Sequence, residues 1–219
     1  NDWTATQTME DLEALMLEED SEKRLAVKLL NPFGEDQSLM RTTLIPGMLG
    51  VLALNLNRRT GHGRFFEVGN VHFNNNLDLP EERKMLGVAY CLEGENFFTL
   101  KGSIELLLER LGVRGAVFVK GGGAYLHPGQ KAQIVADGQV IGELGTVHPD
   151  VLKAFNVSTE AYVAEIDVKK LLAHKVSQIT YAPIPRYPSA DRDIAVVVDE
   201  GISSAEMVAV IVGAPTDVI

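Results

Sequence analysis

The hydrophobic positions between residues 44 and 56 predict a helix that is apolar around almost its whole circumference. A surface helix usually carries a single apolar stripe, whereas this segment carries two. A helix with one face in water would not need the second stripe. We therefore predict that one side packs on the chain's own sheet and the other on a partner; a helix buried inside one large core is the alternative. The first stripe contains Ile45, Met48, Leu49, Leu52, Ala53 and Leu56, and the second contains Leu44, Val51 and Leu54.

The ends and glycines of this segment fit a helix that packs closely on another backbone. It is expected to run from about Pro46 to Arg58, because proline suits a first helical turn, where its missing N–H would have no acceptor. Gly47 and Gly50 lower the helix propensity but allow a second backbone to approach.

The remaining pattern predicts hairpins and amphipathic helices. Segments 64–73 and 84–92 are predicted to be the strands of one antiparallel hairpin, and Asp137-Gly138 is a strong turn signal for a second. Residues 98–111 form an amphipathic helix that Gly112 ends. Strands that return by hairpins, with helices on one side, favour an α+β fold in which an antiparallel sheet is flanked by helices. Shorter elements are expected at 8–22 (an acidic helix capped by Thr8), 24–30, 116–120, 149–155, 161–168 and 169–172.

A proline-rich stretch at residues 181–190 predicts a linker between two domains. We expect a core over residues 1–182 and the start of a second domain over 183–219, with a strand at 194–198 and a helix from about Ser203. One strand and one helix cannot bury both of their faces, so this part must gain its order by packing on the core or on another molecule.

Composition and charge exclude several classes of protein. The net charge of −10 makes the chain a poor nucleic-acid binder on its own. The single cysteine, Cys91, lies in an apolar run, which predicts an inert buried thiol and a reducing compartment. The longest apolar run, residues 44–54, is too short to span a membrane. The chain starts without methionine and stops inside a helical pattern, so we expect a piece of a larger protein.

Residues with possible catalytic or ligand chemistry are few. The Gly-rich loop 119–130 lacks the strand-to-helix context of a phosphate cradle, so we expect an ordinary mobile loop. His127 and His148 each precede proline and are expected to cap turns, because the other histidines offer no zinc-ligand spacing. Glu165 and Asp167 share one side of a strand, as a catalytic pair would, but solvated carboxylates of an edge strand are commoner.

Six sequence blocks resemble one known family in order and spacing. The first is the run from Asn31-Pro32 through "MRTTLIPGML", and the second is "RFFEVGNVHF". The others are "LPEERKMLGV", "FFTLKGSIELLLERLG", "LHPGQKAQIVADGQVIGELGTVHP" and "YPSADRDIAVVVDE". Together they resemble the synthetase-like core of the beta subunit of bacterial phenylalanyl-tRNA synthetase, over nearly the whole chain from about Lys23 onward.

The resemblance implies a fold, an enzyme and its partners. It implies a class II synthetase-like core at 1–182, followed at 183–219 by the truncated start of a ferredoxin-like anticodon-binding domain. The whole enzyme would be a cytoplasmic heterotetramer of two alpha and two beta subunits that joins phenylalanine to tRNA(Phe) with ATP and Mg²⁺. This fragment itself would bind neither ATP nor a metal. The alternatives are a self-sufficient adenylating enzyme and a regulatory or scaffolding relative without an aminoacylation role.

The resemblance also implies roles for individual residues. Catalytic arginines of the superfamily would be sought after residue 73, where the sequence has Asn74–Leu77 and no arginine, so we assign no catalytic, cofactor or metal residue. Arg192 and Asp193 can equally form an internal ion pair. The basic group Arg58, Arg59, His62 and Arg64 can face an acidic partner, a tRNA backbone or only solvent. Predicted interface residues are Leu44, Pro46, Met48, Leu49, Val51, Leu52, Asn55 and Arg58, and predicted tRNA contacts are Arg186, Tyr187 and Arg192.

Overall fold

A computed structural model describes residues 6–32, 34, 37–58, 63–77, 79–91, 93–175, 181 and 193–213. The chain divides into two compact units, Asn1–Ile179 and Thr180–Ile219, which we call the core unit and the C-terminal unit.

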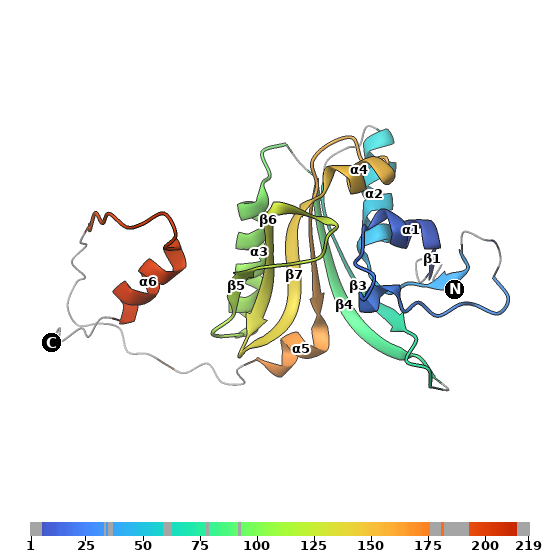
Figure 1. The fold of residues 1–219 in the computed structure, drawn as a ribbon, viewed down its shortest axis with the longest axis horizontal. Coiled ribbons are helices and arrows are strands. Elements are labelled where there is room, and N and C mark those ends of the chain that lie inside the picture. The colour runs from blue at the N-terminus through green and yellow to red at the C-terminus, as the bar shows by residue number, and fades with distance from the viewer. Residues whose placement is uncertain are drawn as a thin grey trace. The chain divides into compact units, whose positions relative to one another are not determined.

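A six-stranded antiparallel sheet forms the centre of the core unit (Figure 1). Its strand order is β3-β4-β8-β7-β6-β5, so β3 and β5 are the edge strands. Both predicted hairpins are confirmed, as is the α+β class with an antiparallel sheet. The strands are β3 (Gly63–Phe73), β4 (Glu81–Cys91), β5 (Val117–Lys120), β6 (Leu126–Ala136), β7 (Gln139–Val147) and β8 (Tyr162–Asp167), and a separate short pair joins β1 (Thr6–Gln7) to β2 (Leu39–Met40).

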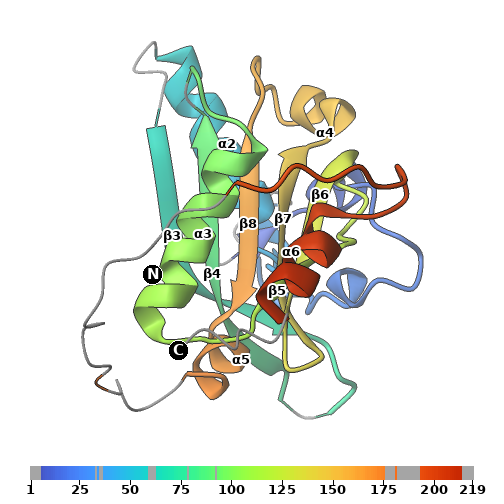
Figure 2. The same cartoon turned by 90° about the vertical axis from the view of Figure 1, so that its left-hand side faces the viewer.

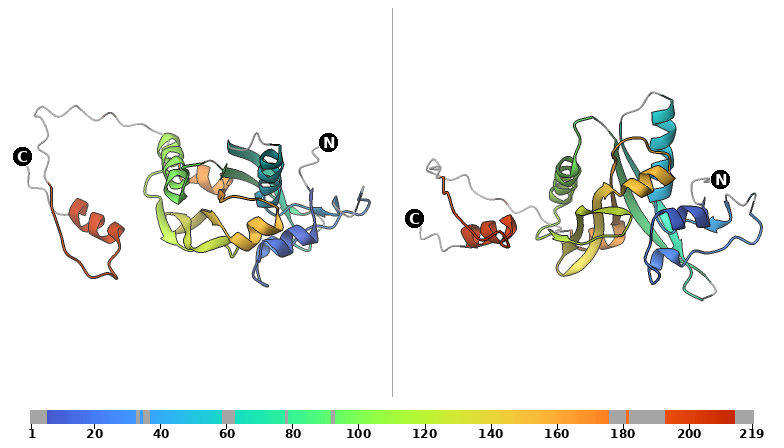
Figure 3. Two further views of the ribbon diagram at one scale, coloured as in Figure 1. Left: turned by 90° about the horizontal axis from the view of Figure 1, so that it is seen from above. Right: turned by 45° about the horizontal axis from the view of Figure 1, so that its top comes forward.

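Helices cover both faces of this sheet, so the expectation of helices on one side was wrong. The reason is that β4 and β8 are apolar on both faces: Ala89 and Val163 belong to one core, and Val88 and Ala164 belong to the other. The right panel of Figure 3 shows α2 and α3 on opposite sides of the strands. One face carries α1 (Met9–Ala14), α2 (Ile45–Asn57) and α4 (Pro149–Ala154), the other carries α3 (Phe97–Leu111), and α5 (Val168–Ala173) follows β8.

Local capping signals account for the helix ends. The side chain of Asn96 accepts hydrogen bonds from the backbone N–H groups of Phe98 and Thr99 at the start of α3, and Gly112 ends the helix at φ 73°. In α1, Thr8 and Asp11 form a capping box. The predicted start of α1 and the predicted end of α3 are confirmed.

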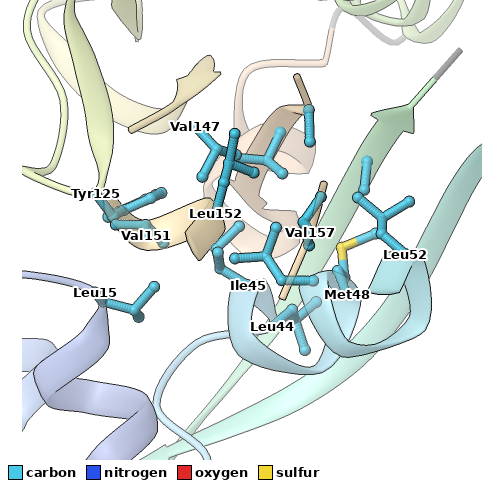
Figure 4. Packing of buried hydrophobic residues seen from close by; sticks show 14 of the residues in the cluster. Leu15, Leu44, Ile45, Met48, Leu52, Tyr125, Val147, Val151, Leu152 and Val157 are labelled. Carbon is cyan, nitrogen blue, oxygen red and sulfur yellow. The ribbon is translucent and has the colours of Figure 1, made fainter. Parts of the chain in front are cut away.

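One side of α2 packs into the core, as predicted, and it is the side that carries the first apolar stripe. Ile45, Leu49 and Leu52 are at most 1% exposed, and Figure 4 shows Ile45, Met48 and Leu52 beside residues of α4 and the strands around it. Gly87 on β4 allows the close approach, because a Cβ there would lie 2.5 Å from the Met48 sulfur. The helix therefore rests directly on the sheet.

Two predicted strands are not formed. Residues 24–30 make only isolated bridges, Ala26 with Phe73 and Lys28 with Leu39. Residues 194–198 are not a strand, because the described part of the C-terminal unit offers no second strand to pair with. Its helix α6 (Ser204–Gly213) begins close to the predicted Ser203. Most of the predicted linker at 181–190 lies outside the described residues.

Candidate subunit interface

The outward face of α2 is made of small and apolar residues. Gly47, Gly50, Val51 and Leu54 recur at intervals of three and four residues, which places them on one side of the helix. All four are exposed, Val51 by 44% and Leu54 by 49%, and a Cβ added at either glycine would meet no atom within 4 Å. We call these four residues the α2 ridge. Such a ridge lets a second helix approach closely.

Burial narrows the predicted interface and corrects part of it. Five of the predicted residues face the chain's own core: Leu44, Pro46, Met48, Leu49 and Leu52. They cannot reach a partner while the core is intact, so the prediction that these five residues contact a partner was wrong. A charged substitution at Leu49 or Leu52 should therefore destabilise the fold. Val51 is exposed, Asn55 is half-buried, donating to the Val51 carbonyl at 2.8 Å, and Arg58 is exposed. A partner contact at these positions stays a prediction.

The strand that follows α2 presents an open edge. The backbone N–H of His72 donates to Arg41 and that of Asn74 to Leu25, both away from β4. Because outward and inward groups alternate along an antiparallel strand, the N–H groups of Arg64, Phe66 and Val68 also point outward. Within the residues that the structure describes, no strand pairs with that side of β3. Figure 2 shows β3 at the edge of the sheet.

Exposed apolar side chains accompany this open edge. Phe66 is 77% exposed and Val68 is 54% exposed, on the α3 side of the sheet. On the other face, Arg41 donates to the Asn70 carbonyl at 2.9 Å and to Glu67 at 2.7 Å, and its guanidinium lies against Gly69. Arg41 thus fixes the N-terminal segment to β3. Sequence reasoning did not single out Arg41, although it lies in the "MRT" block.

A buried ionic cluster occupies the face of the sheet below the N-terminal segment. Glu143 on β7 and Glu165 on β8 are directly opposite each other. The Lys23 ammonium, from a short 3₁₀ turn at Glu22–Arg24, donates to Glu143 at 2.7 Å and to Glu165 at 2.9 Å. Glu165 is 2% exposed, so the reading of Glu165 and Asp167 as solvated edge carboxylates was wrong: β8 is an inner strand. Asp167 caps α5 by accepting from the N–H of Lys170 at 2.9 Å.

The charges in this cluster stabilise each other. Burial alone would lower the pKa of Lys23, but the nearby Glu165, Tyr125 and Glu143 raise it well above its ordinary value. Burial alone would raise the pKa of Glu143, but Lys23 and the hydrogen bonds from Tyr125 and Gly123 hold it below its ordinary value. Lys23 and Glu143 are therefore both charged at neutral pH.

A cavity of about 200 Å³ lies beside this cluster. Its lining carries both signs of charge, because it includes Glu143 and Glu165 together with Lys23, Arg83 and Lys170. The Gly-rich loop beside the cluster makes two hydrogen bonds to it and to β6: Gly123 donates to Glu143 at 2.7 Å, and Lys131 donates to the Gly122 carbonyl at 2.9 Å. The mobility of this loop stays a prediction.

Other predicted residues take structural roles. His127 and His148 accept from the backbone N–H two residues on, each at 3.2 Å, which confirms them as turn caps. Arg64 pairs with Glu95 at 2.7 Å and lies over the Tyr90 ring. Cys91 is buried, and burial raises the pKa of its thiol, as predicted for an inert cysteine.

Several predicted residues lie outside the residues that the structure describes. These are Arg59 and His62 of the basic group, and Arg186, Tyr187 and Arg192, the predicted tRNA contacts.

A comparison with protein families decides the assignment of the core. Residues 5–168 match the model of the phenylalanyl tRNA synthetase beta chain CLM domain. The chain belongs to this family. The matched segment holds α2, β3 and the Lys23 cluster, and ends just after β8.

Curated relatives agree with this family. The chain is 38% identical to the phenylalanine–tRNA ligase beta subunit of Clostridium acetobutylicum over 196 residues, covering 88% of the chain and 25% of the relative. It is 36% identical to the beta subunit of Bacillus subtilis over 203 residues, covering 87% and 25%. The chain thus spans about a quarter of the length of these curated relatives. Among the described residues, no helix is both long enough and apolar enough to cross a lipid bilayer.

Proposed function

We propose that this chain is a non-catalytic core of a phenylalanine–tRNA ligase beta subunit and that it holds the alpha subunit through α2 and β3. The whole enzyme would join phenylalanine to tRNA(Phe) with ATP and Mg²⁺ as a heterotetramer of two alpha and two beta subunits. The observation that carries the proposal is that two consecutive elements both present uncovered surfaces: α2 has an exposed apolar face, and β3 has an open edge.

The two surfaces suit one partner because they belong to consecutive elements. The α2 ridge offers two glycines and two apolar side chains to a second helix. The outward-pointing N–H groups of Arg64, Phe66 and Val68, which pair with no strand among the described residues, offer hydrogen bonds to a strand. Long exposed strand edges are usually blocked in proteins that act alone. A partner with its own helix and strand would cover both.

Support for a non-catalytic role comes from the sequence after β3. Asn74–Leu77 contain no arginine to bind phosphate. Contacts of Arg186, Tyr187 and Arg192 with tRNA belong to the proposal through the family resemblance.

The interface is tested by substituting the α2 ridge. The double variant Val51→Asp with Leu54→Asp should weaken binding of the alpha subunit by more than about tenfold, because the partner would have to bury two charges in place of two apolar side chains. The melting temperature should stay close to that of the unchanged chain, since both side chains are exposed. Co-expression with the alpha subunit followed by size-exclusion chromatography with light scattering measures the assembly.

The matched control is Leu106→Asp on α3, where the replaced leucine is 52% exposed, much as Leu54 is. It should leave assembly unchanged because α3 lies on the other face of the sheet. Assembly that survives the double variant, or that is lost equally in the control, would contradict the proposed interface. A relative with a purely regulatory role would bind no alpha subunit at all.

A further inference from the structure

The surroundings of the Lys23 ammonium match the three donors of a primary ammonium group. Its nitrogen lies 2.7 Å from Glu143 Oε1, 2.9 Å from Glu165 Oε2 and 3.4 Å from the Tyr125 hydroxyl. A primary ammonium has three N–H donors and no acceptor. The side chain of Lys23 is only 17% exposed, so these three contacts replace most of its hydration.

The acceptors are held in place by groups other than Lys23. Glu165 Oε1 accepts from the Thr43 hydroxyl and from the N–H of Leu44, both at 2.7 Å. Glu143 Oε2 accepts from the N–H of Gly123, also at 2.7 Å. Both carboxylates also stand on inner strands of the sheet. Their positions are therefore built into the fold, and the ammonium fills a site that already exists.

The cavities beside the Lys23 ammonium leave room for the carbon part of a different amine. One cavity of about 340 Å³ and another of about 200 Å³ are both lined by Lys23, Gln133 and Glu143. The Lys23 side chain therefore borders both cavities. Shortening it would enlarge the space next to the two carboxylates, which would then lack their cation.

We propose that Glu143, Glu165 and Tyr125 form a primary-ammonium binding site that the chain fills with its own Lys23, and that a free primary amine binds there once the Lys23 side chain is removed. Two carboxylates that face each other across neighbouring strands, one buried and one half-buried, repel without a cation between them. A quaternary ammonium carries the same charge but cannot donate the three hydrogen bonds. In the unchanged chain the site is closed to free amines, amino acids included.

The experiment restores the missing cation to the 219-residue chain carrying Lys23→Ala. This variant should melt lower than the unchanged chain. Methylammonium chloride should raise its melting temperature progressively with the logarithm of concentration, because the amine binds only the folded state. Tetramethylammonium chloride at the same ionic strength should not. The control is Lys101→Ala, in which the lost ammonium belonged to a surface pair with Glu105. Each salt should change the melting temperature of this variant and of the unchanged chain by the same amount.

A second variant tests the acceptors. Adding Glu143→Gln to Lys23→Ala removes one of the two carboxylates. The rise in melting temperature that methylammonium causes should therefore be at most half as large as in Lys23→Ala. If Lys23→Ala does not fold in plain buffer, refolding from urea in each salt gives the same readout, with recovery expected in methylammonium only. An equal response to the two salts, an equal response of Lys101→Ala, or no recovery in either salt would overturn the proposal.

Discussion

At the scale of single residues, the most heavily constrained group is the pair of carboxylates on β7 and β8. Glu143 accepts hydrogen bonds from Lys23, from the Tyr125 hydroxyl at 2.8 Å and from the N–H of Gly123. Each of these favours the charged carboxylate, which explains why its pKa lies below the ordinary value despite burial. The folded state is therefore coupled to pH on the acid side.

Stability should fall with acid through this residue. The pKa of Glu143 is lower in the folded chain than in the unfolded one, so its contribution is complete above the ordinary value of about 4.3 and is lost as pH falls through the folded value. Glu143→Gln should cost about 1–3 kcal/mol at pH 7. Between about pH 5 and 3, the free energy of unfolding of this variant should fall less steeply than that of the unchanged chain. Urea unfolding at a series of pH values measures this.

The comparison variant is Glu109→Gln, because Glu109 is exposed near the end of α3. Its stability should follow that of the unchanged chain at every pH. Parallel curves for Glu143→Gln and the unchanged chain would show that Glu143 does not carry the acid sensitivity.

The sequence predicted residue roles where they depend on near neighbours and missed those that do not. The cap at Thr8, the helix stop at Gly112 and the turn at Asp137 are set within a few residues along the chain. The pair of Lys23 with Glu165 joins residues 142 positions apart. Nothing in the spacing of either residue indicates the other, so Glu165 was mistaken for a solvated carboxylate.

At the scale of elements, α3 shows how the same residue type has opposite effects at two positions. Gly102 lies inside the helix, is exposed, and has no atom within 4 Å of a would-be Cβ. Gly112 ends the helix with φ 73°, a conformation that costs an L-residue energy. Backbone conformation, and not available space, therefore decides each substitution.

Alanine at the two positions should change stability in opposite directions. Gly102→Ala should stabilise the chain by about 1 kcal/mol, because it raises helix propensity without a clash. Gly112→Ala should destabilise it by about 1 kcal/mol, because the left-handed conformation is strained. Urea unfolding of both variants measures the difference. Changes of the same sign would contradict this account of the helix end.

Periodicity predicted the bounds of α2 to within one residue but not the direction of its faces. An apolar circumference does not tell which side meets the sheet; that side is set by Gly87 on a strand far along the chain. Leu44 and Met48 therefore turned out to be core residues, while only Val51 and Leu54 of the second stripe stay exposed. The local pattern of apolar residues predicts that α2 is a helix, but the sheet on which α2 packs decides which of its faces is buried.

At the scale of the whole molecule, the two units differ in how many of their residues are buried. In the part of the chain that the structure describes, every buried residue lies between Gln7 and Leu171. The hairpin pattern predicted the antiparallel sheet of the core unit correctly. It did not predict helices on both faces, because that depends on which strands become inner ones.

A chain ending at residue 179 should therefore keep the stability of the core. Its melting temperature should stay within about 2 °C of the full chain, which corresponds to less than about 1 kcal/mol for a domain of this size. Differential scanning calorimetry of the two chains measures this. A fall of many degrees would show that the C-terminal unit contributes to the core.

The distance along the chain between Lys23 and Glu165 also affects the order of folding. Because the two residues are 142 positions apart, the lysine leaves the ribosome on the order of 10 s before its carboxylate partner. Contacts of such long range form late, because the loop between them must close first. The contact of Lys23 with β8 can therefore form only after β8 has been made, and until then the Lys23 ammonium stays hydrated.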